Sequence, residues 1–165
     1  MANLSSDKRQ EILIDLIKGN KNADIENQCC VLKREKIEKP IIYVGAGTCG
    51  LGAGAAETIQ AIKDYLKNKK IDADIMEVGC IGLCAVEPIV DVQMPGKNRI
   101  SFRKVTAKKV ENVLDQAFTG KFNLEDVLGQ IQSGKVEHWK DIPEFFKLPF
   151  FVKQKRIVLK NCGLV

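Results

Sequence analysis

Three cysteines in glycine-rich loops carry the most distinctive chemistry of this sequence. Cys80 and Cys84 are separated by three residues, the middle one Gly82, and Cys49 lies in a run of glycines that begins at Gly45. Thiolates favour iron–sulfur clusters or zinc, and glycines let backbone amides approach the sulfur atoms. Each loop follows a predicted strand, and in a βαβ unit two such loops emerge at the same end of the sheet. We therefore expect the three thiolates to converge on one site.

Other interpretations of these cysteines stay open at this point. Cysteine is often a small buried apolar side chain and nothing more. Zinc would need a fourth ligand, and the single histidine, His138, lies far along the chain, where we expect it at the surface near Trp139. No Cys-x-x-Cys occurs to supply the attacking thiol of a dithiol oxidoreductase. Of these readings we favour metal or cluster ligation.

The same glycine-rich loop also fits a second pattern. Gly45-x-Gly47-x-x-Gly50 has the spacing of a dinucleotide-binding fingerprint between a strand and a helix, where backbone amides hold a pyrophosphate. However, no acidic residue is cleanly placed about 20 positions on, because Asp72 precedes the next strand and Glu77 lies within it. A hairpin after that strand also breaks the strand–helix rhythm of a doubly wound sheet. Thiol chemistry is therefore the favoured interpretation of the loop.

The elements around these loops predict a small α/β sandwich. We expect strands at residues 41–44 and 73–78, with a helix between them whose inner face includes Ala55 and Leu66. Residues 89–93 and 99–103 predict a hairpin around a Pro-Gly turn, followed by a helix that Thr106 caps. Outside this block we expect a helix at residues 6–19, capped by Ser5 or Ser6, a polar connector at residues 20–39, and a short helix at residues 124–131 capped by Asn123.

Composition and charge exclude several classes of protein. The 165 residues are 45% hydrophobic, enough for a core, and no apolar run approaches the roughly 20 residues that span a bilayer. The net charge is +5, but from Lys135 onward seven Lys or Arg face three Asp or Glu, so the excess lies in a C-terminal extension. We expect neither nucleic-acid binding nor membrane insertion. No secretion signal is visible, so we expect a cytoplasmic protein whose six cysteines are not structural disulfides.

Residues 40–55 and 78–88, the latter reading VGCIGLCAVEP, resemble the thioredoxin-like [2Fe-2S] ferredoxin domain. That domain often precedes the flavin- and NADH-binding module in soluble hydrogenases and related complex I-type dehydrogenases. The resemblance covers about residues 38–118. Residues 149–163, PFFVKQKRIVLKNCG, are independently similar to the start of the flavoprotein module in such subunits.

The resemblance implies that Cys49, Cys80 and Cys84 are cluster ligands. The family's usual pattern has four cysteines, one pair after each of two strands. In this chain Gly45 occupies the earlier position of the first pair, and Cys49 is displaced by one residue. The sequence thus supplies three thiolates where two tetrahedral irons need four ligands.

Several residues are candidates for the fourth ligand. Cys29 or Cys30 could fold in from the N-terminal segment, or the hydroxyl of Thr48 could substitute. Alternatively, the site has lost its cluster and survives as a docking scaffold. Cys162 matches the start of the flavoprotein module rather than the missing ligand.

We expect a thioredoxin-like α/β sandwich with a small mixed sheet, plus an N-terminal helix and an extended C-terminal segment. The predicted organisation is an N-terminal helix and connector over residues 1–39, the ferredoxin domain over 40–118, and a linker with the truncated start of a flavoprotein module over 119–165. The resemblance implies an electron-transfer domain of an NADH dehydrogenase or hydrogenase subunit, whose partners are the other subunits. FMN and NADH would bind only the remainder of such a subunit. The alternative is a cluster-free thioredoxin-like interaction domain that docks partner subunits.

Overall fold

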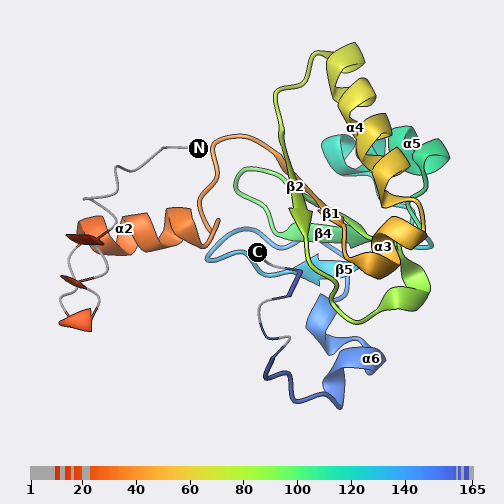
Figure 1. Ribbon diagram of the computed structural model, residues 1–165. Coiled ribbons are helices and arrows are strands. Elements are labelled where there is room, and N and C mark those ends of the chain that lie inside the picture. Colours follow the sequence, from red (N-terminus) through yellow and green to blue (C-terminus); the bar gives the residue numbers. More distant parts are fainter. Residues whose placement is uncertain are drawn as a thin grey trace. The chain divides into compact units, whose positions relative to one another are not determined.

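The computed structural model describes residues 10–11, 14–15, 17–19, 23–158, 160 and 162–163. The chain divides into two compact units, Met1–Lys36 and Ile37–Val165. The second unit contains the sheet and its flanking helices (Figure 1). How the predicted domains at 40–118 and 119–165 divide functionally stays a prediction.

The first unit contains a helix that the sequence did not predict. Residues 23–32 were expected within a connector, but helix α2 spans Ala23–Leu32 and buries Ile25. The helix ends at Leu32, and the turn after it has a left-handed backbone at Arg34, while the N–H of Glu35 donates to the carbonyl of Cys30. In the helix predicted at residues 6–19, the described residues 10, 11, 14, 15 and 17 are helical. Its proposed caps, Ser5 and Ser6, and the apolar Ile12, Leu13 and Leu16 lie outside the described residues.

The second unit is built on a five-stranded mixed sheet in the order β2-β1-β3-β4-β5. Only β1 and β2 pair in parallel, and the other neighbours are antiparallel. The strands are β1 (Ile41–Gly45), β2 (Asp74–Val78), β3 (Val90–Gln93), β4 (Arg99–Phe102) and β5 (Val127–Ile131). The expected α/β class, the mixed sheet and the hairpin are confirmed.

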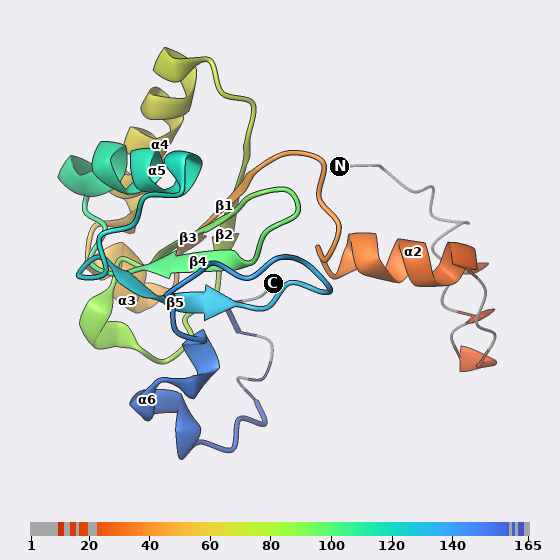
Figure 2. The ribbon, with the colours of Figure 1, turned by 180° about the vertical axis from the view of Figure 1, so that it is seen from behind.

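Two helices cover one face of this sheet. Helix α4 (Ala55–Lys69) connects β1 to β2, and α5 (Val110–Thr119) follows β4; they lie side by side (Figure 2). The core between the sheet and the helices includes Ala55 and Leu66, the predicted inner face of α4. Thr106 lies at the N-cap of the 3-10 turn η2 (Ala107–Lys109), although its side chain forms no capping hydrogen bond. None of the helices in the described part of the chain is long and apolar enough to cross a membrane.

The opposite face of the sheet is polar at its centre and is covered by the C-terminal segment. Tyr43, Asp91 and Ser101 lie side by side across β1, β3 and β4, and all three are buried. The turn η3 (Phe145–Lys147) and helix α6 (Pro149–Val152) lie on this side (Figure 1). Phe145 and Phe151 pack there against residues of β5, so the C-terminal segment is anchored on this face.

Residues 127–131 form a strand and residues 124–126 a turn, where the sequence predicted a helix over residues 124–131. Asn123 caps a turn instead: its side-chain oxygen accepts from the N–H of Glu125, and its carbonyl accepts from the N–H of Asp126. The five residues of β5 are all buried, and four of them pair with β4 across a register shift at Ser101/Phe102. Gly129 permits the close approach of the next segment, since a β-carbon there would lie 2.8 Å from the carbonyl oxygen of Pro143.

Candidate metal centre

Parallel pairing of β1 and β2 brings the three predicted cysteines together. The ends of both strands are register partners, Gly45 with Val78, so the loops that follow them leave the sheet side by side. Cys49 lies in the short helix α3 (Thr48–Gly52) after β1, and Cys80 lies in the loop after β2. Cys84 opens the 3-10 turn η1 (Cys84–Val86).

The three sulfur atoms form a compact triangle. All of them lie within 4.8 Å of one another, and the sulfurs of Cys80 and Cys84 are 3.6 Å apart. Four sulfurs around one tetrahedral ion, with metal–sulfur bonds of about 2.3 Å, are about 3.8 Å apart. The triangle is therefore already spaced for ligation. Because Cys49 and Cys84 are exposed and Cys80 is half-buried, the site opens to solvent.

Backbone geometry at the two loops supports this arrangement. Gly82 has a φ of +88° and its N–H donates to the Cys80 sulfur at 3.2 Å, the kind of contact that stabilises a thiolate. A β-carbon on Gly47 would lie 3.0 Å from that of Cys80, and one on Gly50 would overlap the carbonyl oxygen of Gly45. The glycines that resemble a dinucleotide fingerprint thus serve the close packing of the two cysteine loops.

Burial shapes the protonation of this site. Burial raises the pKa of the Cys80 thiol, and neighbouring Cys84 and the charge of Glu87 add to the shift, whereas the Gly82 N–H opposes it. The metal-free Cys80 therefore keeps its proton at neutral pH. Since metals bind the thiolate, ligation must release that proton, and binding becomes stronger as pH rises.

Glu87 is a site residue that sequence reasoning missed. Its carboxylate is buried and accepts a hydrogen bond from the N–H of Ile89 at 2.7 Å. Burial raises the pKa of this carboxyl, the Ile89 N–H opposes the shift, and the charge of Asp91 adds to it. A β-carbon on Gly45 would lie only 2.9 Å from Glu87 Oε2. In the sequence, the Glu-Pro pair after Cys84 contributed to the family resemblance but gave no sign of this contact.

The other candidate ligands are placed differently. Cys29 and Cys30 lie in α2, in the Met1–Lys36 unit, and Thr48 is the first residue of α3. His138 is exposed, as expected. Within the described residues, the group of cysteine, histidine and carboxylate side chains spaced for a metal consists of Cys49, Cys80 and Cys84.

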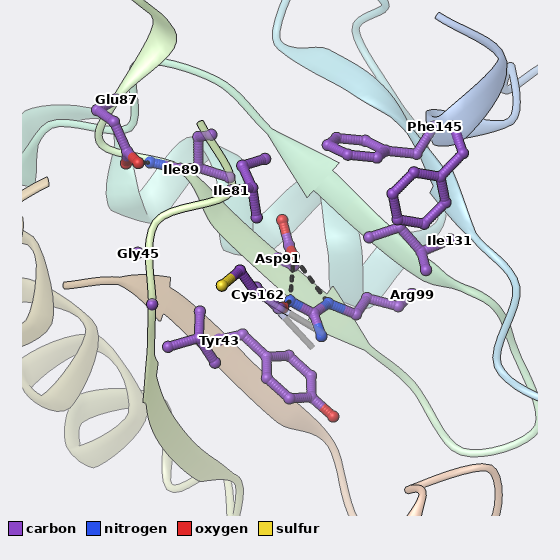
Figure 3. A pocket seen from close by; sticks show the side chains of 14 residues that line it. Tyr43, Gly45, Ile81, Glu87, Ile89, Asp91, Arg99, Ile131, Phe145 and Cys162 are labelled. Atoms are coloured by element: carbon purple, nitrogen blue, oxygen red, sulfur yellow. Dashed lines mark hydrogen bonds and ion pairs between the residues drawn. The ribbon is translucent and has the colours of Figure 1, made fainter. Parts of the chain in front are cut away.

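Cys162 lies in a pocket on the polar face of the sheet (Figure 3). There Arg99 Nε donates to Asp91 at 2.7 Å, and the guanidinium lies 3.7 Å above the centre of the Tyr43 ring. A second nitrogen of Arg99 donates to the carbonyl of Gly163. The pocket is also lined by Ile81, from the loop between Cys80 and Cys84, so the C-terminal segment borders the candidate metal centre.

Fold and site together define a small α/β domain with three cysteine side chains at one end of a mixed sheet. No family model matches the chain. It is similar to the NADP-reducing hydrogenase subunit HndB of Solidesulfovibrio fructosivorans, with 29% identity over 79 residues. That match covers 47% of this chain and 63% of the relative, so the chain spans less than two thirds of the curated relative's length.

Similar solved structures include two of a thioredoxin-like [2Fe-2S] ferredoxin from Aquifex aeolicus. One matches with a TM-score of 0.47 and 17% identity, covering 61% of this chain and all of that one. The wild-type ferredoxin at 1.5 Å matches with a TM-score of 0.45 and 17% identity, covering 56% of this chain and 98% of that one.

Proposed function

We propose that this chain is an electron-transfer domain of an NADH dehydrogenase- or hydrogenase-type flavoprotein subunit, with Cys49, Cys80 and Cys84 as ligands of a [2Fe-2S] cluster. The observation that carries the proposal is the triangle of three sulfurs within 4.8 Å, presented by two loops at one end of the sheet. When bound, such a cluster accepts and donates single electrons.

The residues of the chain have distinct parts in this function. The three thiolates hold the metal. The N–H of Gly82 donates to the Cys80 sulfur and so stabilises negative charge on that sulfur. Cys49 and Cys84 are exposed, so a redox partner can approach the site without rearrangement of the core. Hydride chemistry would belong to FMN and NADH in another part of the subunit.

The similarity to a hydrogenase subunit supports a place in a multi-subunit complex. Its partners would be the other subunits of an NADH dehydrogenase or hydrogenase, in the cytoplasm, with no nucleic acid. The segment after residue 149 would lead into a flavoprotein module.

A cluster-free interaction domain is the second candidate function. It is favoured by Gly45, which stands where the resemblance places a fourth cysteine, and by exposed apolar side chains near the C-terminus. Val152, Ile157 and Val158 are 64%, 74% and 91% exposed, and they are available to a partner subunit. Such a domain would fold and bind its partner without metal.

Anaerobic reconstitution with iron and sulfide separates the two functions. The electron-transfer domain should turn brown, contain iron and sulfide in equal amounts, and give an electron paramagnetic resonance signal after reduction. Cys80→Ser and Cys84→Ser should abolish the signal, and Cys162→Ser, outside the triangle, should keep it. Zinc analysis of the protein as isolated tests single-ion binding. A colourless protein without iron would favour the interaction domain.

A further inference from the structure

A [2Fe-2S] cluster held by this chain needs a fourth ligand from the protein. This inference rests on the proposed function, because it concerns the same site. Two tetrahedral irons that share two sulfides each take two protein ligands, and the triangle supplies three. Carboxylate oxygen is also a metal ligand in proteins, so acidic side chains beside the triangle are candidates.

The carboxylate of Glu87 lies between the two cysteine loops. Its Oε2 atom is 2.9 Å from the β-carbon position of Gly45 and 3.5 Å from that of Gly50, the residue after Cys49. On the other side, the N–H of Glu87 donates to the carbonyl of Cys84 at 3.3 Å. The side chain therefore extends from the loop of Cys80 and Cys84 toward the loop of Cys49.

Among the described residues, the buried Glu87 carboxyl has no cationic partner. The residue is 8% exposed, and the ion pairs among the described residues do not include it. A buried carboxylate without a positive partner is costly, and a single N–H, that of Ile89, offsets little of this cost. A metal centre at the adjacent triangle would supply the missing positive charge.

We propose that Glu87 is the fourth protein ligand, with its carboxylate taking the place that Gly45 leaves without a side chain. Among the described residues, no carboxylate oxygen joins the three sulfurs within 4.8 Å. Glu87 would therefore complete the set of four protein ligands only after a rotation of its side chain toward the three sulfurs.

The Glu87 carboxylate lies in the space that a side chain at position 45 would need. A cysteine at position 45 would place its β-carbon against the Glu87 carboxylate. Gly45→Cys should therefore restore a four-thiolate site only when Glu87 is also shortened. The pair Gly45→Cys with Glu87→Ala should retain iron, whereas Glu87→Ala alone should lose it.

The test compares Glu87→Gln and Glu87→Cys with the unaltered protein after anaerobic reconstitution. Glu87→Gln keeps an acceptor for the Ile89 N–H but loses the charge, so iron release to a chelator should accelerate by about 10-fold or more. Glu87→Cys should hold iron at least as well as the unaltered protein and shift the visible and electron paramagnetic resonance spectra toward those of all-thiolate clusters. Glu77→Gln and Glu77→Cys, at an exposed acidic residue of β2, are the matched controls and should change nothing. Circular dichroism melting of the metal-free variants checks that they fold.

The outcomes separate the inference from the proposed function. Unaltered protein that takes up no iron overturns both. Unaltered protein that forms a cluster, while folded Glu87→Gln and Glu87→Cys retain the same iron content, release rate and spectra, overturns the assignment of Glu87 alone.

Discussion

Gly163 lies so close to Ile81 that a β-carbon at position 163 would overlap the Ile81 side chain. Ile81 stands between Cys80 and Cys84, so the C-terminal segment is packed directly on the candidate metal loop. Arg99 secures the same segment by donating to the carbonyl of Gly163 while it pairs with Asp91. Ile81 and Arg99 together hold the residues near 163 against the loop that carries Cys80 and Cys84.

Gly163→Ala should release the C-terminal segment from the metal loop. The backbone φ of +80° already disfavours alanine by about 1–3 kcal/mol, and overlap with Ile81 adds to that cost. We expect faster reaction of Cys162 with a thiol reagent while the core stays folded. Gly96→Ala is the control, because its φ is +74° and nothing lies within 4 Å, so it isolates backbone strain. Equal Cys162 reactivity in both variants would contradict the contact.

Arg99→Met should destabilise the second unit strongly. Arg99 is 3% and Asp91 5% exposed, and removing the guanidinium leaves the carboxylate buried without its partner. Losses of about 3–5 kcal/mol are typical of such changes. Lys147→Met breaks an exposed pair with Glu144 and should cost less than about 1 kcal/mol. Urea unfolding of the two variants measures the difference, and similar losses would show that the buried pair does not stabilise the sheet face.

The titration of Tyr65 should lower the free energy of unfolding as pH rises above about 10. Burial, together with the hydrogen bond to Asp115, raises the pKa of this phenol in the folded protein. Above its ordinary pKa the unfolded chain loses the proton that the folded chain keeps, so the free energy of unfolding falls with pH. The Tyr65→Phe variant should be less stable at pH 8 but show a shallower decline. Urea midpoints measured from pH 8 to 11 give the slope of stability against pH for the unaltered protein and for Tyr65→Phe. Equal slopes in the two proteins would refute the role of Tyr65.

Cobalt binding should strengthen as pH rises from about 6 to 8. Cys80 keeps its proton in the metal-free protein because burial raises its pKa, and the bound form needs the thiolate. The thiolate-to-cobalt absorption bands report the affinity directly. Cys80→Ser should lose most of the absorption, whereas Cys29→Ser tests whether the α2 cysteines contribute. An affinity independent of pH would mean that thiolates do not form the site.

Sequence patterns were sufficient where a single physical signal dominated. The continuous apolar run at residues 41–44 and the turn at Pro95-Gly96 predicted β1 and the β3–β4 hairpin, and the two cysteine loops converged as parallel strands require. The patterns failed where tertiary pairing decided the outcome. The segment at residues 127–131 is short and largely apolar, a pattern that does not distinguish a strand from a buried helix. Its pairing with β4 makes it a strand.

Residue spacing in the sequence could not reveal Glu87, because its place at the site depends on a tertiary contact. Its carboxylate meets Gly45, 42 positions earlier in the sequence, across the ends of the strands. Helix α2 was missed for a different reason: its polar residues and paired cysteines lack the apolar periodicity that marks an amphipathic helix.

The most direct test of the electron-transfer proposal is the iron and acid-labile sulfide content of the unaltered protein after preparation without oxygen. We predict about two irons and two sulfides per chain. Both should be lost when Cys80 is replaced by serine. Protein that is fully folded, with reduced thiols, and that contains neither iron nor sulfide after reconstitution would contradict it.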